Sequence, residues 1–294
     1  MSDNNDVLQR IRAEYKTFSK GQKRIADYIE QHYEKTTKMT ATKLGEASIV
    51  SESTVVRFAT QLGYEGYPEF QKALQKRIRN KINSVQRLMI TYDELTEDDA
   101  CEMVLKTDLE NLKRTYEEMD PTAYKKAARM IVESKHIYIV AGRSTNVLSE
   151  FMRHYLSYII DDVRVVESGN IAETLEEMYS LSASDTVIGI SFPRYSANTS
   201  ETLRYSRESG AGIIAITDSD ISPISKMADV CLYAKSDMAS IADSLVAPLS
   251  VVNALITTVS MLKKEETVNT MSRMEKLWAE YGVYGSDSEI SGNE

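Results

Sequence analysis

The first eighty residues carry apolar positions at helical intervals. Ser19 and Gln22 have the spacing of a capping box, which predicts a first helix from about residue 20 to 34. Thr40 can cap a second, shorter helix, and Ser48–Val50 then leaves room only for a tight turn before the next helix begins. Two short helices across a tight turn are typical of a helix-turn-helix.

The helix expected after that turn has two different faces. Val55, Phe58 and Leu62 fall on one side and can be buried, whereas Ser53 and Arg57 fall on another. Such a helix can pack by one side and enter a DNA groove with the other. The alternative is a small helical bundle whose polar face is merely solvated.

A polar segment separates this region from the rest of the chain. Residues 76–98 are first basic and then acidic, which indicates a domain boundary. Beyond it an amphipathic helix is expected, with a narrow apolar seam formed by Leu105, Leu109, Leu112, Tyr116 and Met119. We expect this seam to be buried against the C-terminal domain; pairing with a second subunit is the alternative.

Beyond residue 135, short β-branched runs alternate with helical segments. Five runs are predicted to be strands: 136–141, 163–166, 186–191, 212–217 and 230–234. Nearly continuous apolar strands separated by helices predict a parallel sheet covered on both faces, a doubly wound α/β domain. A long apolar helix is expected over 242–262, and the polar residues 285–294 are expected to be disordered.

The helix after the first of these strands should pack by one face. The positions expected to face inward are Val147, Leu148, Phe151, Tyr155 and Ile159. For the helix over 242–262 the corresponding positions are Leu245, Leu249, Val252, Ile256 and Val259.

Ligands of doubly wound sheets bind at the carboxyl ends of the strands, and two loops there are rich in hydroxyls. Residues 142–146 follow the first strand and 191–199 follow the third, each just before a helix whose N-terminus favours a phosphate. Arg194 adds a fork of donors for a phosphate or carboxylate. The candidate effector-binding residues are Gly142, Arg143, Ser144, Thr145, Ser191, Arg194, Tyr195, Ser196 and Thr199. Serines that simply cap helices are the alternative, but two similar loops at one sheet edge favour an anion site.

Candidate DNA contacts lie at the start of the helix after the turn. Ser and Thr hydroxyls there can bind base edges, and arginine can bind guanine with two hydrogen bonds. The candidates are Ser51, Glu52, Ser53, Thr54 and Arg57, together with Lys43, which could reach a phosphate.

Charge and composition adjust this interpretation. The net charge of −9 by itself argues against a nucleic-acid partner, but residues 1–85 hold 15 basic against 10 acidic side chains and residues 86–294 hold 20 against 34. A basic N-terminal segment on an acidic body fits local DNA binding. Neither a membrane-spanning apolar run nor a signal segment is apparent, so the protein is expected to be cytoplasmic, with no membrane partner.

The cysteines and histidines are scattered. Cys101 and Cys231 lack the spacing of a metal or redox pair, and His32, His136 and His154 are equally dispersed. We therefore expect two free thiols, no metal site and no cofactor.

The N-terminal residues resemble a known family. The sequence STVVRFATQLGYEGYPEFQKAL is similar to the DNA-binding domain of the RpiR family of bacterial sugar-responsive transcriptional regulators, over residues 1 to about 80. The resemblance implies that the helix starting after Ser51 reads DNA. In the turn before it, this chain has Ile49 where the family often has glycine.

The second half resembles the sugar isomerase (SIS) domain over about 125 to 265. The motifs TVIGIS, GAGIIAITDS and SPISKMADVCLYA carry the resemblance, which implies a five-stranded parallel α/β module that binds phosphosugars. By position, Ser144 matches the family's phosphate-binding serine, and Ser191, Ser196 and Thr199 lie in its second Ser/Thr loop. The chain departs from the family in VAGRS, which replaces a G-x-G-x-S turn, and in FPRYS, which replaces S-G-x-T.

We therefore expect an all-α helix-turn-helix domain followed by a doubly wound, five-stranded parallel-sheet (SIS) domain. The expected boundaries are 1–80 for the DNA-binding domain, 81–120 for a helical connector, 121–265 for the SIS domain and 266–294 for a C-terminal helix and tail. The expected function is a regulator of sugar metabolism genes that binds a double-stranded DNA operator as a homodimer or homotetramer and responds to a phosphosugar.

Two alternatives belong to other classes of function. The first is a phosphosugar isomerase with an accessory N-terminal domain, which would need an acid/base pair; Glu173, Glu201 and His154 are possible members, but none lies in a recognisable motif. The second is a regulator whose SIS domain only oligomerises. We expect no catalytic residues.

Overall fold

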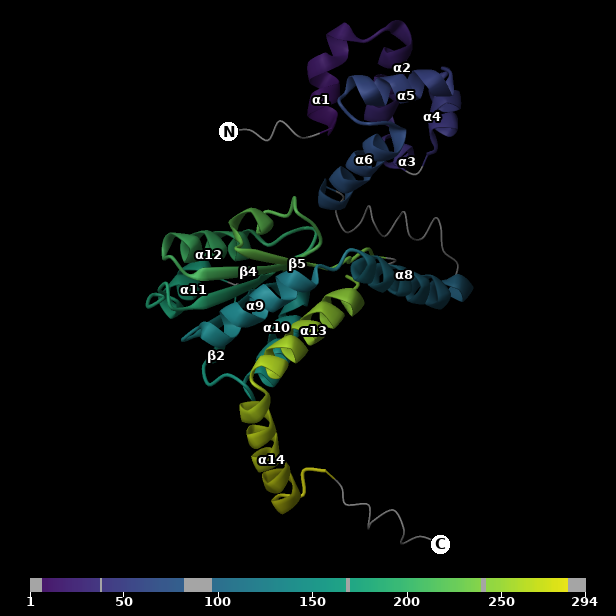
Figure 1. Cartoon of the computed structure of the whole chain (residues 1–294). Helices are drawn as coiled ribbons and strands as arrows, with labels where there is room; N and C mark the ends of the chain where they lie inside the picture. The colour runs from purple at the N-terminus through teal and green to yellow at the C-terminus, as the bar shows by residue number, and fades with distance from the viewer. Residues whose placement is uncertain (1–6, 38, 82–96, 168–169, 239–241, 285–294) are drawn as a thin grey trace, which may run out of the picture. The chain divides into compact units, whose positions relative to one another are not determined.

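The computed structural model describes residues 7–37, 39–81, 97–167, 170–238 and 242–284 (Figure 1). The chain divides into two compact units, Met1–Gln86 and Arg87–Glu294. The first unit is helical, and the second is built around a parallel sheet.

The N-terminal unit contains the predicted helix-turn-helix. Its helices are α1 (Val7–Glu14), α2 (Lys20–Gln31), α3 (Tyr33–Thr36), α4 (Ala41–Ser48), α5 (Glu52–Gln61) and α6 (Tyr67–Lys81). The capping box predicted at Ser19 and Gln22 is present. The first predicted helix ends three residues early, however, because His32 leaves helical geometry (φ −128°, ψ 39°) before α3 begins.

One aromatic cluster holds these helices together. Phe58 of α5 is fully buried between Phe18, at 5.0 Å between ring centroids, and Phe70 of α6, at 5.7 Å. Val55 and Leu62 are buried on the same side of α5, as the sequence predicts. The opposite side of α5 is therefore left for solvent or a partner.

The second unit contains the predicted sheet. Its strands are β1 (Ile137–Ala141), β2 (Val163–Glu167), β3 (Thr186–Ile190), β4 (Gly212–Thr217) and β5 (Val230–Tyr233). All neighbours are parallel, in the order β2-β1-β3-β4-β5, so the predicted doubly wound topology is confirmed.

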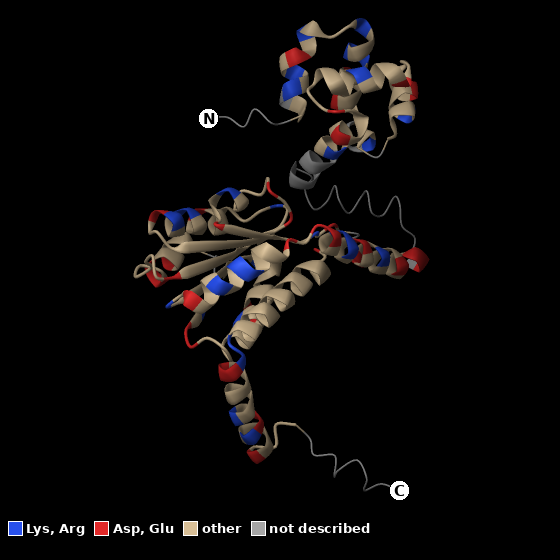
Figure 2. Ribbon diagram, viewed as in Figure 1, with Lys and Arg blue, Asp and Glu red and all other residues tan. Residues whose placement is uncertain are grey.

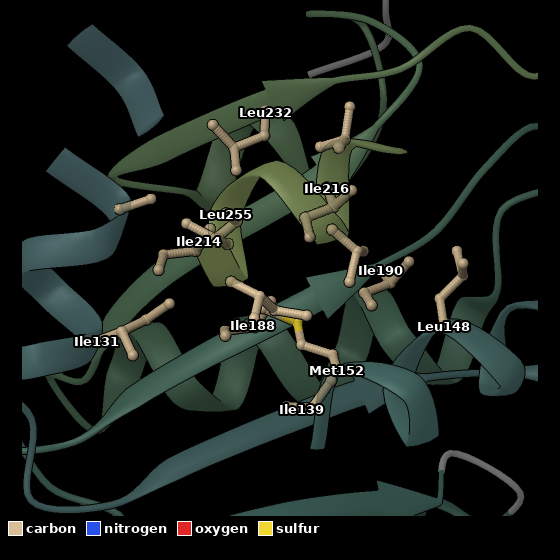
Figure 3. Packing of buried hydrophobic residues seen from close by; sticks show 14 of the residues in the cluster. Ile131, Ile139, Leu148, Met152, Ile188, Ile190, Ile214, Ile216, Leu232 and Leu255 are labelled. Carbon is tan, nitrogen blue, oxygen red and sulfur yellow. The ribbon is translucent and has the colours of Figure 1, made fainter. Parts of the chain in front are cut away.

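Helices cover both faces of this sheet. One face packs against α9 (Pro121–Glu133), α10 (Asn146–Leu156) and α13 (Val246–Leu262), and the other against α11 (Ile171–Glu177) and α12 (Ala197–Glu208). Figure 3 shows the first of these cores, where Ile188 and Ile214 of the sheet lie with Met152 of α10 and Leu255 of α13. The layers leave the carboxyl ends of the strands open to the loops that follow β1 and β3.

The buried stripe of α10 differs from the predicted one. Leu148, Met152 and Leu156 are buried at intervals of four, whereas Val147 and Tyr155, expected to face inward, are 60% and 43% exposed. The expectation was wrong for Val147 and Tyr155, because the helix is turned by about one residue, or 100°, so that Met152 takes the central inward position. Leu148 is buried, and Phe151 and Ile159 are partly buried against the core, as expected. The long apolar helix also begins at Val246, four residues later than predicted.

The seam predicted for the connector helix is not buried. Four of its five residues lie on this helix, α8 (Glu97–Glu117), and Met119 lies two residues beyond it; all five are exposed, by 37% to 74%. The expectation of burial against the domain was wrong because α8 contacts the domain by its polar face, where Asn111 and Thr115 are buried. Figure 2 shows the contrast between the charges along α8 and the uncharged ribbon of α13.

The last helix described, α14 (Lys264–Glu280), has no buried residue. Trp278 contacts the ring of Tyr158 edge-on, at 6.4 Å between centroids. No single helix among those described is long and apolar enough to cross a membrane; α13 and α14 pass that test of length and composition only as a pair, which is bent by 103°. The tail predicted to be disordered, 285–294, lies outside the described residues.

Candidate functional site

The turn between α4 and α5 is tight because two positions allow it. Gly45 faces the turn so closely that a Cβ there would lie 2.9 Å from the carbonyl oxygen of Val50. Ile49 adopts the left-handed conformation (φ 56°, ψ 51°), and the Val50 N–H donates to the carbonyl of Gly45 at 2.8 Å. The glycine-like turn geometry is thus kept by an isoleucine whose side chain is 77% exposed.

Three of the predicted DNA contacts share the exposed surface of α5. Ser51 caps the helix and accepts from the Thr54 N–H at 3.3 Å, and Ser53 lies one turn before Arg57. The Arg57 Nε donates to the Ser53 carbonyl at 3.3 Å, which directs the guanidinium along this surface. Lys43 is exposed on α4. Serine hydroxyls and a guanidinium at the start of one helix can bind base edges.

Two further candidates are engaged inside the motif. The Thr54 hydroxyl pairs with that of Ser51 at 2.9 Å, and its methyl group lies against Gly21 of α2. The Glu52 carboxylate accepts from the Thr42 hydroxyl at 2.8 Å. These side chains connect the helices of the motif, which the sequence pattern alone did not indicate.

The two hydroxyl-rich loops meet at one pocket, as predicted. Its lining residues are Gly142, Arg143, Ser144, Thr145, Ser191, Phe192, Pro193, Arg194, Ser196 and Asp243. Two arginines of this pocket, Arg143 (φ 59°) and Arg194 (φ 70°), have left-handed backbones, which cost about 1–2 kcal/mol for a residue with a Cβ. Strain repeated in both loops is typical of a functional site.

The hydroxyls of the pocket have distinct partners. Ser191 is buried, and its Oγ accepts from the Ser196 N–H at 3.2 Å. Ser196 caps α12, accepting from the Thr199 N–H at 3.2 Å, while Thr145 donates to the carbonyl of Gly142 at 2.8 Å. Ser191 and Thr145 are therefore buried and bond within the loops. Ser144, in the loop after β1, is exposed.

Two predicted effector residues do not line this pocket. The Tyr195 hydroxyl donates to Oδ1 of Asp218 at 2.7 Å, and burial together with the Asp218 charge raises the pKa of Tyr195. Thr199 is fully buried, and its Oγ1 has no hydrogen-bond partner within the described part of the chain. Tyr195 and Thr199 therefore stabilise the second loop and do not form part of the pocket lining.

Asp243 is the lining residue that the sequence pattern did not reveal. It lies just before α13 and accepts a hydrogen bond from the Ser144 hydroxyl at 2.6 Å. The two residues are ninety-nine positions apart, and no motif around Asp243 indicated a site. A carboxylate therefore lies in the same pocket as the hydroxyls of the two loops and the two arginines.

The residues considered for acid/base catalysis lie elsewhere. Glu201 forms an ion pair with Arg204 at 2.6 Å, Glu173 is exposed on α11, and His154 contacts the Tyr158 hydroxyl at 3.2 Å. None of them lines the pocket. Among the described residues no group of three or more His, Cys, Asp or Glu could hold a metal ion, and both cysteines there are free thiols.

Comparison with protein families gives one match within the helical N-terminal unit and another within the unit that contains the sheet. Residues 5–81 match the helix-turn-helix domain of the rpiR family, and residues 130–258 match the SIS domain. The chain is 27% identical over 235 residues to an HTH-type transcriptional regulator of Haemophilus influenzae, covering 79% of this chain and 81% of that protein. It is 22% identical to the HTH-type transcriptional regulator HexR of Escherichia coli K12, covering 92% of this chain and 93% of that protein.

Solved structures show the same fold. The sugar isomerase domain of an RpiR transcription factor from Sphaerobacter thermophilus is 25% identical, with a TM-score of 0.57, over 60% of this chain and 99% of that one. The Vibrio vulnificus NanR protein, complexed with ManNAc-6P, is 17% identical, with a TM-score of 0.58, over 95% of this chain and all of that one.

Proposed function

The chain belongs to the RpiR family of helix-turn-helix transcriptional regulators with a SIS domain, and we propose that a phosphosugar bound in the pocket of Ser144 and Ser191 controls its binding to operator DNA. The regulated genes are then those of sugar metabolism. The observation that carries this proposal is the meeting of two hydroxyl-rich loops and two arginines at the carboxyl edge of the sheet.

For the DNA contact, we propose that α5 enters the major groove. Its Ser51, Ser53 and Arg57 contact base edges, and Lys43 contacts a phosphate. Glu52 and Thr54 act at the same end of the helix chiefly by holding α5 in place: Glu52 accepts from Thr42 of α4, and the Thr54 methyl group lies against Gly21 of α2. The excess of basic over acidic side chains in residues 1–85 supports the N-terminal unit as the DNA-binding part of the chain.

For the effector, the ligand class follows from the donors in the pocket. The hydroxyl of Ser144, the guanidinium groups of Arg143 and Arg194 and the helix N-termini that follow both loops favour a phosphate. Tyr195 and Thr199 contribute by supporting the second loop. The NanR protein, which has a similar fold, is complexed with a sugar phosphate, and this supports the same ligand class.

We propose that the pocket binds its ligand without converting it. Aldose–ketose isomerisation needs a positioned acid and base. Within the described lining, Asp243 is a single carboxylate with no histidine or second carboxylate beside it. The names of the relatives, which are transcriptional regulators, support the same conclusion.

The assembly proposed is a homodimer or homotetramer. The exposed seam of α8 is an apolar stripe on a helix whose other face is already bonded to the domain, so a second subunit can cover it. A two-fold dimer would bind inverted half-sites about one helical turn, or a multiple of it, apart.

The experiment is a thermal-shift screen of the full chain with a panel of sugar phosphates. A ligand at about 100 times its Kd stabilises the folded state by about 2.7 kcal/mol, which is a shift of several degrees. We expect at least one compound to raise the Tm of the wild type and of the control Arg204→Gln, whose side chain lies in an exposed ion pair outside the pocket, but not that of Arg194→Gln. If no sugar phosphate shifted the wild type, the effector role would be rejected.

A further inference from the structure

Asp243 is an acidic residue in a pocket whose arginines and hydroxyls favour an anion. Its Oδ2 accepts a hydrogen bond from Ser144 at 2.6 Å, so the exposed hydroxyl of the first loop is donated to a carboxylate of the same chain. A phosphate bound to this loop would need the same hydroxyl. The carboxylate and the phosphate therefore compete for one donor.

The competition is also electrostatic. A phosphate bound at Ser144 while Asp243 kept its present position would place two negative groups within hydrogen-bonding distance of one hydroxyl. At such separations the repulsion between two unit charges is about 1 kcal/mol in water and several times larger in a partly desolvated site. Effector binding thus favours a position of Asp243 away from Ser144.

The structure provides room for that movement. Asp243 also lines a second cavity, between α8 and the start of α13, whose wall includes Val104, Asp108 and Leu249. The two cavities share Asp243 as a common wall. Rotation of this one side chain can therefore vacate the first cavity without disturbing the sheet.

The residue after Asp243 is bonded to α8. The Ser244 hydroxyl donates to Oδ1 of Asp108 at 2.5 Å. Further along the same helix, Asn111 donates to the Asp237 carbonyl at 2.8 Å, and Arg114 forms an ion pair with the Asp237 carboxylate at 2.8 Å. One polar face of α8 thus bonds both to Asp237 and to Ser244, the residue that follows Asp243.

We propose that Asp243 competes with the effector for Ser144. When no effector is bound, Asp243 holds the Ser144 hydroxyl. An anion bound at Ser144 displaces Asp243 and thereby shifts Ser244 and helix α8. This inference rests on the proposed function, because it assigns the regulation of the same pocket. Along the chain, helix α8 is the first described element after the DNA-binding unit.

The first test measures the affinity of the full chain for inorganic phosphate by calorimetry. Because Asp243→Asn removes the charge and keeps a hydrogen-bond acceptor, we expect it to bind phosphate about tenfold more tightly than the wild type. Asp243→Ser serves as a second variant with the same expected direction. The control Glu173→Gln removes one negative charge from an exposed site on α11 and should leave the affinity unchanged. Equal affinities for wild type, Asp243→Asn and Asp243→Ser would overturn the proposal.

The second test follows α8 by hydrogen exchange of its backbone amides. In the wild type, saturating phosphate should speed exchange around Asp108. In Ser244→Ala, which breaks the bond to α8 but does not touch the first pocket, phosphate should still bind and leave α8 exchange unchanged. If bound phosphate left the amide exchange of α8 unchanged in the wild type, the proposed link from Asp243 through Ser244 to α8 would be overturned.

The outcomes also separate this inference from the proposed function. If sugar phosphates stabilise the wild type but Asp243→Asn gains no affinity for phosphate, the effector role stands and the competitor role fails. If neither phosphate nor any sugar phosphate binds either protein, both fail together.

Discussion

Arg24 of α2 donates a hydrogen bond from Nη1 to the carbonyl oxygen of Ile49, at 3.0 Å, and so connects α2 to the turn of the helix-turn-helix. The same isoleucine has a left-handed backbone, a conformation that disfavours β-branched side chains. The turn is therefore held by its surroundings: by Arg24, by the close approach of Gly45 to Val50 and by the cap of Ser51.

Ile49→Gly should stabilise the protein. Relief of the left-handed strain gives about 1–2 kcal/mol, and the greater freedom of glycine in the unfolded chain offsets about 0.5–1 kcal/mol of it. Little packing is lost, since the side chain is mostly exposed. Urea unfolding should give a free energy of unfolding higher by about 0.5–1 kcal/mol. Ile49→Ala, which keeps the Cβ, is the matched control; a gain equal to that of the glycine variant would refute the strain.

Arg57→Ala and Lys43→Ala should weaken DNA binding in different ways. If Arg57 contacts a base, its loss costs about 1–3 kcal/mol and relaxes specificity at one position of the operator. If Lys43 contacts a phosphate, its loss weakens binding to all sequences and lowers the salt dependence. Selection from a random DNA library followed by affinity measurements at several salt concentrations distinguishes them. Uniform weakening by Arg57→Ala would refute base contact and indicate a phosphate contact.

Tyr195→Phe should destabilise the loop after β3. The variant loses a half-buried hydrogen bond to a carboxylate, which is worth about 1.5–3 kcal/mol. Because the pKa of Tyr195 is raised on folding, this contribution is fully present below pH 10, the ordinary pKa of tyrosine, and declines as the pH rises beyond it. Unfolding of both proteins between pH 7 and pH 11 measures the difference. A difference that grew above pH 10 would contradict this account.

Leu109→Glu should dissociate the assembly. Leu109 lies in the middle of the α8 seam and is 68% exposed, so the folded subunit tolerates the charge while an apolar interface does not. Analytical ultracentrifugation should show a smaller species at the same concentration. Tyr179→Glu, at a site of 81% exposure outside α8, is the control and should keep the wild-type mass. An unchanged mass for Leu109→Glu would exclude the seam as the interface.

Local pattern was enough to predict helices α2, α4 and α5 and the five strands. Ser19, Thr40 and Ser51 each precede an amphipathic segment with a cap, and the structure has a helix after each. The five strands were predicted because buried parallel strands are continuous apolar runs, and their carboxyl ends correctly located the two loops of the pocket.

What the sequence did not reveal depends on tertiary contacts. The apolar period of α8 identified its seam but not what covers it, because Asn111 and Thr115, which bind the domain, are polar. Asp243 reaches the pocket only because the residues before α13 lie beside the loop that follows β1, a proximity that no local pattern encodes. The direction of Tyr195, toward Asp218, depends in the same way on the neighbouring strand.

Control of operator binding by the effector is tested by the affinity of the full chain for a selected operator fragment, measured with and without a sugar phosphate that raises its Tm. We predict that saturating sugar phosphate changes the operator Kd of the wild type by about tenfold or more, a coupling of about 1.4 kcal/mol, and leaves that of Arg194→Gln unchanged. An operator Kd of the wild type that is the same with and without bound sugar phosphate would contradict the account.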